Sequence, residues 1–271
     1  MKRDALGDRM KDYENISRTY LTRRIPVIIR LDGKAFHTFT RGLEKPFDKI
    51  LMSVMQQTMK RLCEEVQGCV FGYTQSDEIT LVLTDYATIQ TDAWFGYNIQ
   101  KMASVAASIA TVEFNRQFRE AFLILCDEQD DSVACQDRLR TLSSKLDVAM
   151  FDARCFSIPK EEVCNCLIWR QQDATRNSIE AVGQAHFSHA QLHGKSCNMI
   201  QEMLWGECNI NWNDFPTDCQ RGAACYRVER TVEMDNPRNP GETITVQRRQ
   251  WEIDREIPVF TQDRNFIERF L

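Results

Sequence analysis

Three short runs of apolar, largely β-branched residues early in the chain predict buried strands. They occupy residues 25–29, 69–74 and 79–83. The first run leads directly into Asp32, and the second and third are separated only by residues 75–78. This spacing places Asp32 at the end of one strand and Asp77 at the bend of a hairpin.

Apolar residues that recur with a helical period predict three longer helices. They cover residues 47–66, with Gly68 suited to the helix end, residues 92 to about 112 behind Asp92 as a cap, and residues 161–182. We expect residues 1–24 to be partly helical and residues 127–147 to form a loop with a short helix. Further strands are expected at 148–156, 209–212, 223–228 and 243–246, with a turn or mobile loop at 235–241.

The order strand, helix, hairpin, helix, strand predicts an α+β fold in which helices pack on one antiparallel sheet. No repeat, low-complexity tract or flexible linker divides the chain. We therefore expect one compact unit. Within it, residues 1–160 would form the catalytic portion, and residues 161–271 a smaller C-terminal α/β portion packed on it.

Composition narrows the class of protein. The chain has 271 residues, 43% of them hydrophobic and 27% charged, and a formal net charge of −5. Apolar stretches are only strand-sized and no signal-peptide core is present, so we expect no membrane span and a cytoplasmic location. The 11 cysteines include no C-x-x-C pair, which favours reduced thiols. A nucleic-acid partner would have to bind local basic patches.

The carboxylates at the two strand ends are the first candidates for chemistry. Mg²⁺ prefers hard oxygen ligands and keeps several waters, so one or two carboxylates together with substrate phosphates can hold it. Taken singly, Asp32 fits a tight turn and Asp77 a solvated hairpin tip. Because each acid ends a buried strand, the pair instead favours a two-metal site for phosphoryl transfer.

Residues near these acids could contact a nucleotide. The backbone amides of residues 34–37 follow the first strand directly and could surround a triphosphate. His37 could pair with a phosphate when protonated, or pack with neighbouring phenylalanines. On the helix predicted after residue 160, Arg170 and Asn177 share one face, so both could address the same ligand.

Two other patterns resemble functional motifs and are rejected. His186, His189 and His193 have the spacing of one helical face, but without H-E-x-x-H or a nearby carboxylate they do not predict zinc. Residues 194–196, Gly-Lys-Ser, resemble the end of a P-loop. His189 stands where that motif requires its first glycine, so no P-loop is expected.

Two longer motifs resemble those of a known family. Residues 30–39, Arg-Leu-Asp-Gly-Lys-Ala-Phe-His-Thr-Phe, and residues 72–78, Gly-Tyr-Thr-Gln-Ser-Asp-Glu, are similar to the signature motifs of the tRNA-His guanylyltransferases. Supporting matches lie at 151–154, 169–173 and 209–212. Order and spacing match over most of residues 25–215, so the resemblance is specific.

The resemblance implies a fold and a set of site residues. The fold would be the palm of polymerases and nucleotidyl cyclases, here extending the 5′ end of tRNA with two Mg²⁺ ions and with ATP, GTP and other NTPs as substrates. Asp32, Gly33 and Asp77 would hold the metals, and Glu78 would support them in catalysis. The nucleotide would contact Asp32, Gly33, Lys34, Ala35, Phe36, His37, Ser76 and Asp77. Phosphate or tRNA contacts would come from Arg30, Lys101, Arg154, Arg170 and Asn177.

One departure from the family pattern bears on substrate choice. Where eukaryotic members carry a histidine-containing motif after the Trp-Arg-Gln segment, this chain has Thr175 in place of the histidine and keeps Asn177. That motif accompanies selective addition of one guanosine to tRNA-His. Its loss favours the branch that repairs 5′-truncated tRNA by template-dependent 3′-to-5′ addition, with ATP activating 5′-monophosphate ends.

Three alternatives stay open. The chain could add a single guanosine to tRNA-His, it could be a nucleotidyl cyclase that uses the same two metals, or it could bind tRNA without catalysis. The intact carboxylate pair argues against the last, because buried acids without a metal or partner are unfavourable. Members of the family are tetramers, so the resemblance also implies a homo-oligomer.

Overall fold

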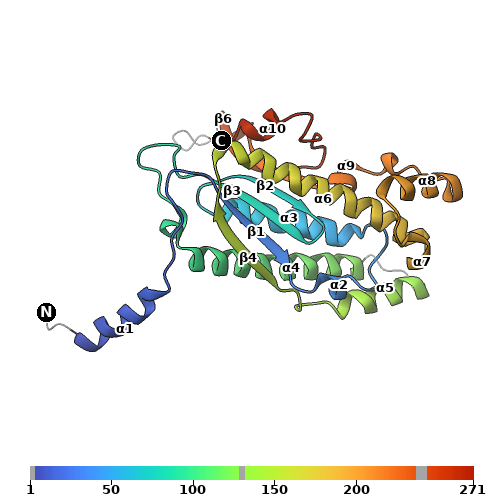
Figure 1. The fold of residues 1–271 in the computed structure, drawn as a ribbon, viewed down its shortest axis with the longest axis horizontal. Coiled ribbons are helices and arrows are strands. Elements are labelled where there is room, and N and C mark those ends of the chain that lie inside the picture. The colour runs from blue at the N-terminus through green and yellow to red at the C-terminus, as the bar shows by residue number, and fades with distance from the viewer. Residues whose placement is uncertain (1–3, 128–131, 236–242) are drawn as a thin grey trace.

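Six strands form one antiparallel sheet with the order β4-β1-β3-β2-β5-β6 (Figure 1). The computed structural model describes residues 4–127, 132–235 and 243–271. The strands are β1 (Val27–Gly33), β2 (Cys69–Gln75), β3 (Glu78–Leu83), β4 (Phe151–Ser157), β5 (Ala223–Asp235) and β6 (Thr243–Asp254). The longer helices are α1 (Ala5–Ile16), α3 (Lys49–Glu65), α4 (Ile99–Asp127), α5 (Val133–Ser143), α6 (Lys160–His186) and α8 (Cys197–Cys208). Short helices are α2 (Phe36–Phe39), α7 (His189–Leu192), α9 (Thr217–Arg221), α10 (Asn265–Glu268) and the 3₁₀ helices η1 (Trp94–Tyr97) and η2 (Trp212–Asp214).

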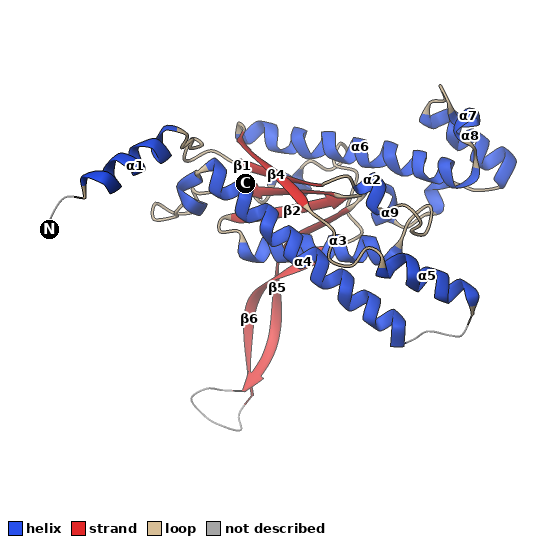
Figure 2. Cartoon of the chain, turned by 90° about the horizontal axis from the view of Figure 1, so that it is seen from below, coloured by secondary structure: helices blue, strands red, loops and turns tan. Residues whose placement is uncertain are grey.

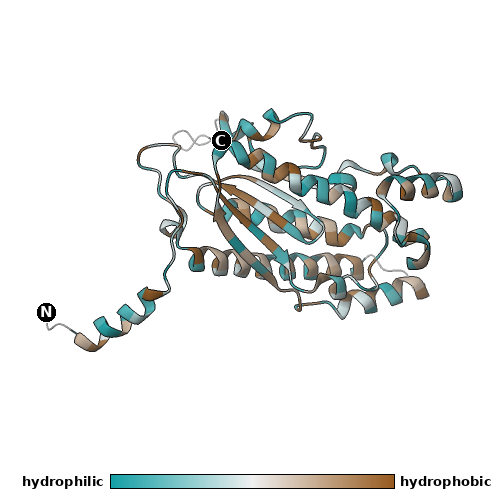
Figure 3. Ribbon diagram, in the orientation of Figure 1, coloured by the Kyte–Doolittle hydropathy of each residue, from teal (hydrophilic) through white to brown (hydrophobic). Residues whose placement is uncertain are grey.

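One face of the sheet packs on α3 and α4 through an apolar core. β1 contributes Val27, Ile29 and Leu31 to this core, because every second side chain of a strand points to the same face. Five phenylalanine rings, which contact one another in pairs, close the core near the end of β1: Phe36, Phe39, Phe114, Phe118 and Phe151. The apolar colour of the central strands is visible in Figure 3. Burial of this surface is the main source of stability.

The other face is crossed by α6. Its first half packs Val163 and Leu167 against Ile28 of β1 in a second apolar cluster, which α10 also joins. Its second half extends past the end of the sheet, where Val182 packs with Ile200 of α8. The helix is therefore anchored by apolar contacts at both ends and spans the strand ends between them (Figure 2).

Two elements project from the body. β5 pairs with β2 only over residues 223–225 but with β6 along its whole length, so most of this hairpin extends away from the sheet (Figure 2). α1 also lies apart from the other helices and buries none of its residues (Figure 1). Within the described residues, no helix has both the length and the apolar character needed to cross a bilayer.

The predicted α+β fold with one antiparallel sheet is confirmed. The strands expected at 25–29, 69–74 and 79–83 correspond to β1, β2 and β3, and the helices expected at 47–66 and 161–182 to α3 and α6. The boundary near residue 160 stays a prediction. β5 and β6, which follow that residue, belong to the same sheet as the earlier strands.

Other local predictions are wrong. No strand forms at 209–212, because Asn209 ends α8 with a φ of 54° and the chain then enters η2. The helix expected from Asp92 begins at Ile99, because Phe95 and Gly96 have positive φ values of 51° and 60°. The short helix expected within residues 127–147, by contrast, is present as α5, which covers 11 residues. Most of the turn predicted at 235–241 lies outside the described residues.

Candidate active site

The ends of β1 and β3 bring three acids together. Asp32 and Glu78 are register partners on these adjacent strands. The amide of Gly33 donates a hydrogen bond to the carbonyl of Asp77 (3.1 Å), which links the end of β1 to the hairpin bend. Ser76 forms that bend with a φ of 50°, and its hydroxyl donates to Asp77 Oδ1 (3.1 Å). Asp32, Asp77 and Glu78 thus lie at one end of the sheet.

The electrostatics of Asp77 indicate a site that attracts a cation. Burial raises the pKa of Asp77, and the negative charge of Asp32 raises it further. Hydrogen bonds from its own amide and from Ser76, and the nearby His37, oppose this shift in the pKa only in part. A buried carboxylate beside a second negative charge, as Asp77 is beside Asp32, is stabilised when a cation binds next to it.

Glu78 is held by a buried arginine. Burial raises the pKa of Glu78, while the positive charges of Arg170 and Arg30 lower it. Arg170 Nε lies 2.8 Å from Glu78 Oε1, and Arg170 also forms an ion pair with Asp173 on the same helix. This contact fixes α6 against the strand ends beside the acids.

The residues at this end of the sheet fit Mg²⁺. In the described part of the chain, no group of three His, Cys, Asp or Glu side chains is arranged to hold a metal. Mg²⁺ does not need such a group, because one or two carboxylates with waters and substrate phosphates are sufficient. Asp32, Asp77 and the carbonyl of Gly33 form a set of this kind. A side chain at Gly33 would come within 2.3 Å of the Phe36 ring, so only glycine fits there.

The segment after β1 offers backbone amides near the acids. Ala35 has a φ of 55° and precedes α2, whose Phe36 is buried in the aromatic core. Among the described residues, the amides of Ala35, Phe36 and His37 find no backbone acceptor, whereas that of Lys34 donates to the carbonyl of Met150 (2.8 Å). His37 is exposed and does not pack in the core, so the packed alternative for this residue is wrong.

A cavity of about 370 Å³ opens beside Ser76. Its walls come from the segment between α2 and α3, from α6, and from the region before β5; they include Lys45, Phe47, Gln75, Ser76, Asn177 and Gly222. The volume is in the range of pockets that bind small ligands, and its position puts a ligand next to the acids.

Two of the predicted basic residues lie on the face that α6 covers. Arg30 is two positions before Asp32, and its Cζ lies 5.6 Å from the centroid of the Trp169 ring. Arg154 is its register partner on β4, with Nη2 3.2 Å from Asp152 Oδ1. Arg30 therefore lies on the same strand as Asp32, and Arg154 lies beside Arg30 on β4.

Lys101 is not brought to the acids. It lies in the first turn of α4, with Nζ 5.9 Å from the centroid of the Phe95 ring. Contacts of α4 with this end of the sheet begin further along the helix, at Thr111, whose hydroxyl accepts from the amide of Phe151 (3.2 Å). Ten residues of helix, about 15 Å, separate the two positions. The geometry of this chain gives no support to a phosphate contact from Lys101.

The structure gives Arg170 and Asn177, which were expected to address one ligand, different surroundings. Arg170 is only 5% exposed and is paired with carboxylates, whereas Asn177 is exposed and lines the cavity beside Ser76. Their common helical face is real, but long-range pairing with Glu78 takes up the charge of Arg170. Sequence periodicity alone does not reveal such a partner.

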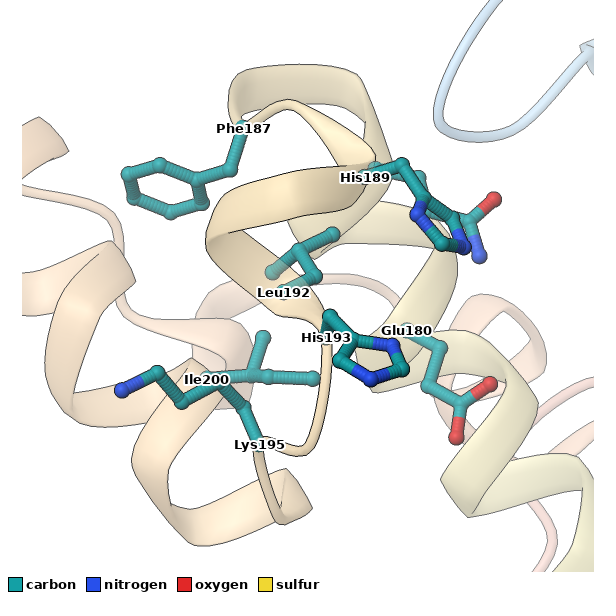
Figure 4. A pocket seen from close by; sticks show the side chains of 8 residues that line it. Glu180, Phe187, His189, Leu192, His193, Lys195 and Ile200 are labelled. Atoms are coloured by element: carbon teal, nitrogen blue, oxygen red, sulfur yellow. The ribbon is translucent and has the colours of Figure 1, made fainter.

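Two of the three histidines line a separate cavity. α6 ends at His186, so the three residues do not share one helix as their spacing suggests. The rings of His189 and His193 have centroids 6.0 Å apart, and together with Glu180 they line a cavity of about 450 Å³ (Figure 4). Ser196, from the segment that resembles a P-loop, instead caps α8 by accepting from the amide of Met199.

Residues that sequence reasoning missed form the walls of the cavity beside Ser76. Asp48 accepts hydrogen bonds from the amides of Glu44 and Leu51 and from Arg138, each 3.0 Å long, and so fixes the segment between α2 and α3. Gly222 has a φ of 83°, and a Cβ there would lie 2.4 Å from the Thr74 carbonyl oxygen. In the sequence, Asp48 could have been found as an acid that caps a helical pattern, and Gly222 as a glycine that precedes a predicted strand.

Comparison with known proteins agrees with this geometry. A family model described as tRNAHis guanylyltransferase matches residues 7–159. The solved structure of a bacterial tRNAHis guanylyltransferase-like protein in complex with ATP is 39% identical, with a TM-score of 0.80 and 98% of each chain covered. Another, in complex with GTP, is 36% identical, with a TM-score of 0.75, and covers 98% of this chain and 99% of that one. The tRNAHis guanylyltransferase of Saccharomyces cerevisiae is 25% identical over 223 residues, 77% of this chain and 85% of that protein.

Proposed function

Because the chain belongs to the tRNAHis guanylyltransferase family, we propose that it repairs the 5′ end of truncated tRNA by template-dependent 3′-to-5′ nucleotide addition. Family membership makes the chain a nucleotidyltransferase. The direction of addition, the RNA substrate and the selection of each nucleotide by the opposing base are the proposed part.

The observation that carries the proposal is the position of the cavity next to the acids. Ser76 lines the cavity and donates to Asp77, so a nucleotide bound there has its reactive groups beside Asp32 and Asp77. The amides of residues 35–37, which find no backbone acceptor among the described residues, lie just past the end of β1, where they can contact a triphosphate. The same residues thus serve binding and chemistry.

Asp32, Asp77 and the carbonyl of Gly33 would hold two Mg²⁺ ions. When bound, such ions supply positive charge that stabilises the developing charge on the transferring phosphoryl group. Glu78 and Arg170 keep the strand ends and α6 in a fixed arrangement around the acids. Fixed groups of this kind need no reorganisation during the reaction, which is the main advantage of an enzyme site.

The proposed reaction on a 5′-monophosphate end has two transfers. An oxygen of the 5′ phosphate attacks the α-phosphorus of ATP, a P–O bond forms, and pyrophosphate leaves. The 3′ hydroxyl of the incoming nucleotide then attacks the activated 5′ phosphorus, its proton passes to solvent, and AMP leaves. A 5′-triphosphate end already has a leaving group and needs no ATP.

Template dependence is supported by Thr175, which stands where the histidine of the single-guanosine motif is expected. Addition of guanosine regardless of the opposing base requires a device that recognises one tRNA. Addition of a paired nucleotide does not, because base pairing selects the NTP. The guanylyltransferase-like proteins that resemble the chain over nearly its whole length are consistent with this branch.

The test is a matrix of opposing bases and NTPs. A tRNA lacking its first 5′ nucleotide is prepared with each opposing base, on a histidine and a non-histidine tRNA body, and is incubated with each NTP in turn. We expect the Watson–Crick partner to be added on both bodies. Labelled ATP should adenylylate 5′-monophosphate ends only.

The second candidate is single-guanosine addition to tRNA-His, which the match to the family model favours. Guanosine added to the histidine body alone, whatever the opposing base, would replace the repair proposal with this one. A cyclic nucleotide product would indicate a cyclase, and bound but unchanged RNA a binding protein. The same assay separates all four functions.

We also propose that the protein acts as a homo-oligomer, with the tetramer of the family as the expected state. The projecting β5-β6 hairpin and α1, whose Leu6, Met10 and Tyr13 are exposed, are consistent with contacts between copies. Light scattering on the purified protein measures the mass directly. A monomer at assay concentration would contradict this proposal.

A further inference from the structure

We propose that Trp169 is a stacking surface for a nucleobase on the side of the acids opposite the Ser76 cavity. This inference rests on the proposed function, which requires two nucleotide partners at the same time. The Ser76 cavity would hold the incoming NTP, and the second partner is the 5′ end of the RNA or, in the activation step, ATP. The base on Trp169 would belong to the second partner, either the 5′-terminal nucleotide of the RNA or the activating ATP.

The surroundings of Trp169 are unusual for an exposed aromatic residue. The side chain is 50% exposed, yet Arg170 Cζ lies 4.2 Å and Arg30 Cζ 5.6 Å from its ring centroid. Guanidinium groups at these distances hold an indole ring by cation–π attraction. The ring is therefore kept in place while half of its surface stays open to a ligand.

The ring lies close to the reaction site. Arg30 is two residues before Asp32 and on the same face of β1, so about 7 Å of strand separates them. Arg170, the other arginine against the ring, forms the ion pair with Glu78. A base on Trp169 would thus have its own phosphate within reach of the acids.

Charge near the ring suits a nucleotide rather than an apolar ligand. Arg30 Nε is buried and has no hydrogen-bond partner within the described residues. Arg154, its register partner, keeps about half of its side chain exposed beside Asp152. A donor without a partner and an accessible guanidinium beside an open aromatic ring form the combination that binds single-stranded nucleic acid.

There is also room for a base. The ring borders a hollow of about 560 Å³ that Gln172, Thr175 and Arg176 also line. Amide, hydroxyl and guanidinium groups can pair with the edge of a stacked base. The hollow contains the position of Thr175, at which the chain departs from the family pattern.

The site is distinct from the Ser76 cavity. Asn177, which lines that cavity, follows Trp169 by eight residues of α6, about 12 Å along the helix. The ion pair of Arg170 with Glu78 lies between the two positions along the helix. α6 therefore presents one surface to each of the two nucleotide partners.

The test compares RNAs that differ in a single base. Fluorescence anisotropy measures the affinity of the full-length protein for a 3′-labelled truncated tRNA whose 5′-terminal nucleotide is either normal or abasic. The KM for ATP in adenylylation of a 5′-monophosphate end is measured in parallel. The variants are Trp169→Ala, Trp169→Phe and the control Trp205→Ala, since Trp205 on α8 is 61% exposed and the described residues place no arginine over its ring.

If the base belongs to the RNA, Trp169→Ala weakens binding of the normal RNA about 5- to 150-fold and leaves binding of the abasic RNA unchanged. If it belongs to ATP, the KM for ATP rises instead and both RNA affinities are unchanged. In either case Trp169→Phe recovers most of the effect and Trp205→Ala shows none.

The proposal is overturned if Trp169→Ala weakens both RNAs equally with an unchanged KM for ATP, or changes neither quantity. It is also overturned if the wild-type protein does not distinguish the two RNAs and does not use ATP. Failure of the proposed function has a different signature. In that case the wild-type protein binds RNA but produces no extended product, and the anisotropy comparison still reports on Trp169.

Discussion

The two faces of the sheet share the same strands but carry different chemistry. On β1, Val27, Ile29 and Leu31 enter the apolar core under α3 and α4, whereas Arg30 and Asp32 lie on the face that α6 covers. Because side chains alternate along a strand, one segment of seven residues supplies both core and site. Substitutions on the two faces should therefore separate stability from activity.

The largest effect on stability is expected on the apolar face. Phe114 is fully buried and its ring contacts those of Phe36, Phe39, Phe118 and Phe151. Phe114→Ala should lower the free energy of unfolding by about 3–5 kcal/mol, because it leaves a cavity among these rings. Urea denaturation measures this loss, and activity per folded molecule should be unchanged. If the folded variant instead loses activity, the apolar face is not separate from the site.

On the α6 face the expected pattern is reversed. Asp32→Asn and Asp77→Asn should each reduce nucleotide addition by at least about 10²–10³-fold in a single-turnover assay, because they remove charge that stabilises the transition state. Their free energy of unfolding should be no lower than that of the wild type, since a repulsive charge is gone. Asp137→Asn, at an exposed acid on α5, is the control and should keep full activity. Near-normal turnover in either site variant would remove these acids from the mechanism.

Gly222 affects both the stability of the fold and the shape of the cavity beside Ser76, which it lines. Gly222→Ala should destabilise the protein by about 1–3 kcal/mol and raise the KM for the incoming NTP, because φ is 83° and the Thr74 carbonyl leaves no space. Gly206→Ala is the matched control: a Cβ there meets nothing within 4 Å, and replacing a glycine inside α8 should add about 0.5–1 kcal/mol. Equal effects of the two substitutions would contradict the strain argument.

Local patterns predicted the parts of the molecule that local patterns determine. The apolar run before Asp32 and the hairpin around Asp77 were found from the sequence, because both depend on residues near in the chain. The strand expected at 209–212 was wrong because alternation there competes with Asn209 as a helix end. The ion pair of Glu78 with Arg170 links residues far apart in sequence, and no spacing rule reveals it.

The smallest effect expected is a pH dependence of stability. Burial, together with Asp32, raises the pKa of Asp77 in the folded state, and burial raises that of Glu78. The folded state therefore holds these protons more tightly than the unfolded state does. As pH falls through the folded-state pKa values toward the unfolded ones, these two groups make the free energy of unfolding of the metal-free protein larger. Thermal denaturation at several pH values should show a smaller stabilisation at low pH in Asp77→Asn than in the wild-type protein. If the pH dependence of stability is identical in the two proteins, Asp77 does not have a raised pKa in the folded state.

The most direct test of the cation site is Mg²⁺-dependent thermal stability of the wild type and Asp77→Asn. We predict that Mg²⁺ raises the melting temperature of the wild-type protein, because an ion that binds only the folded state stabilises it. The required Mg²⁺ concentration should fall as pH rises through the elevated pKa of Asp77, since protons compete with the ion. Asp77→Asn should lose this response. Equal stabilisation of both proteins by Mg²⁺ would contradict a cation site between Asp32 and Asp77.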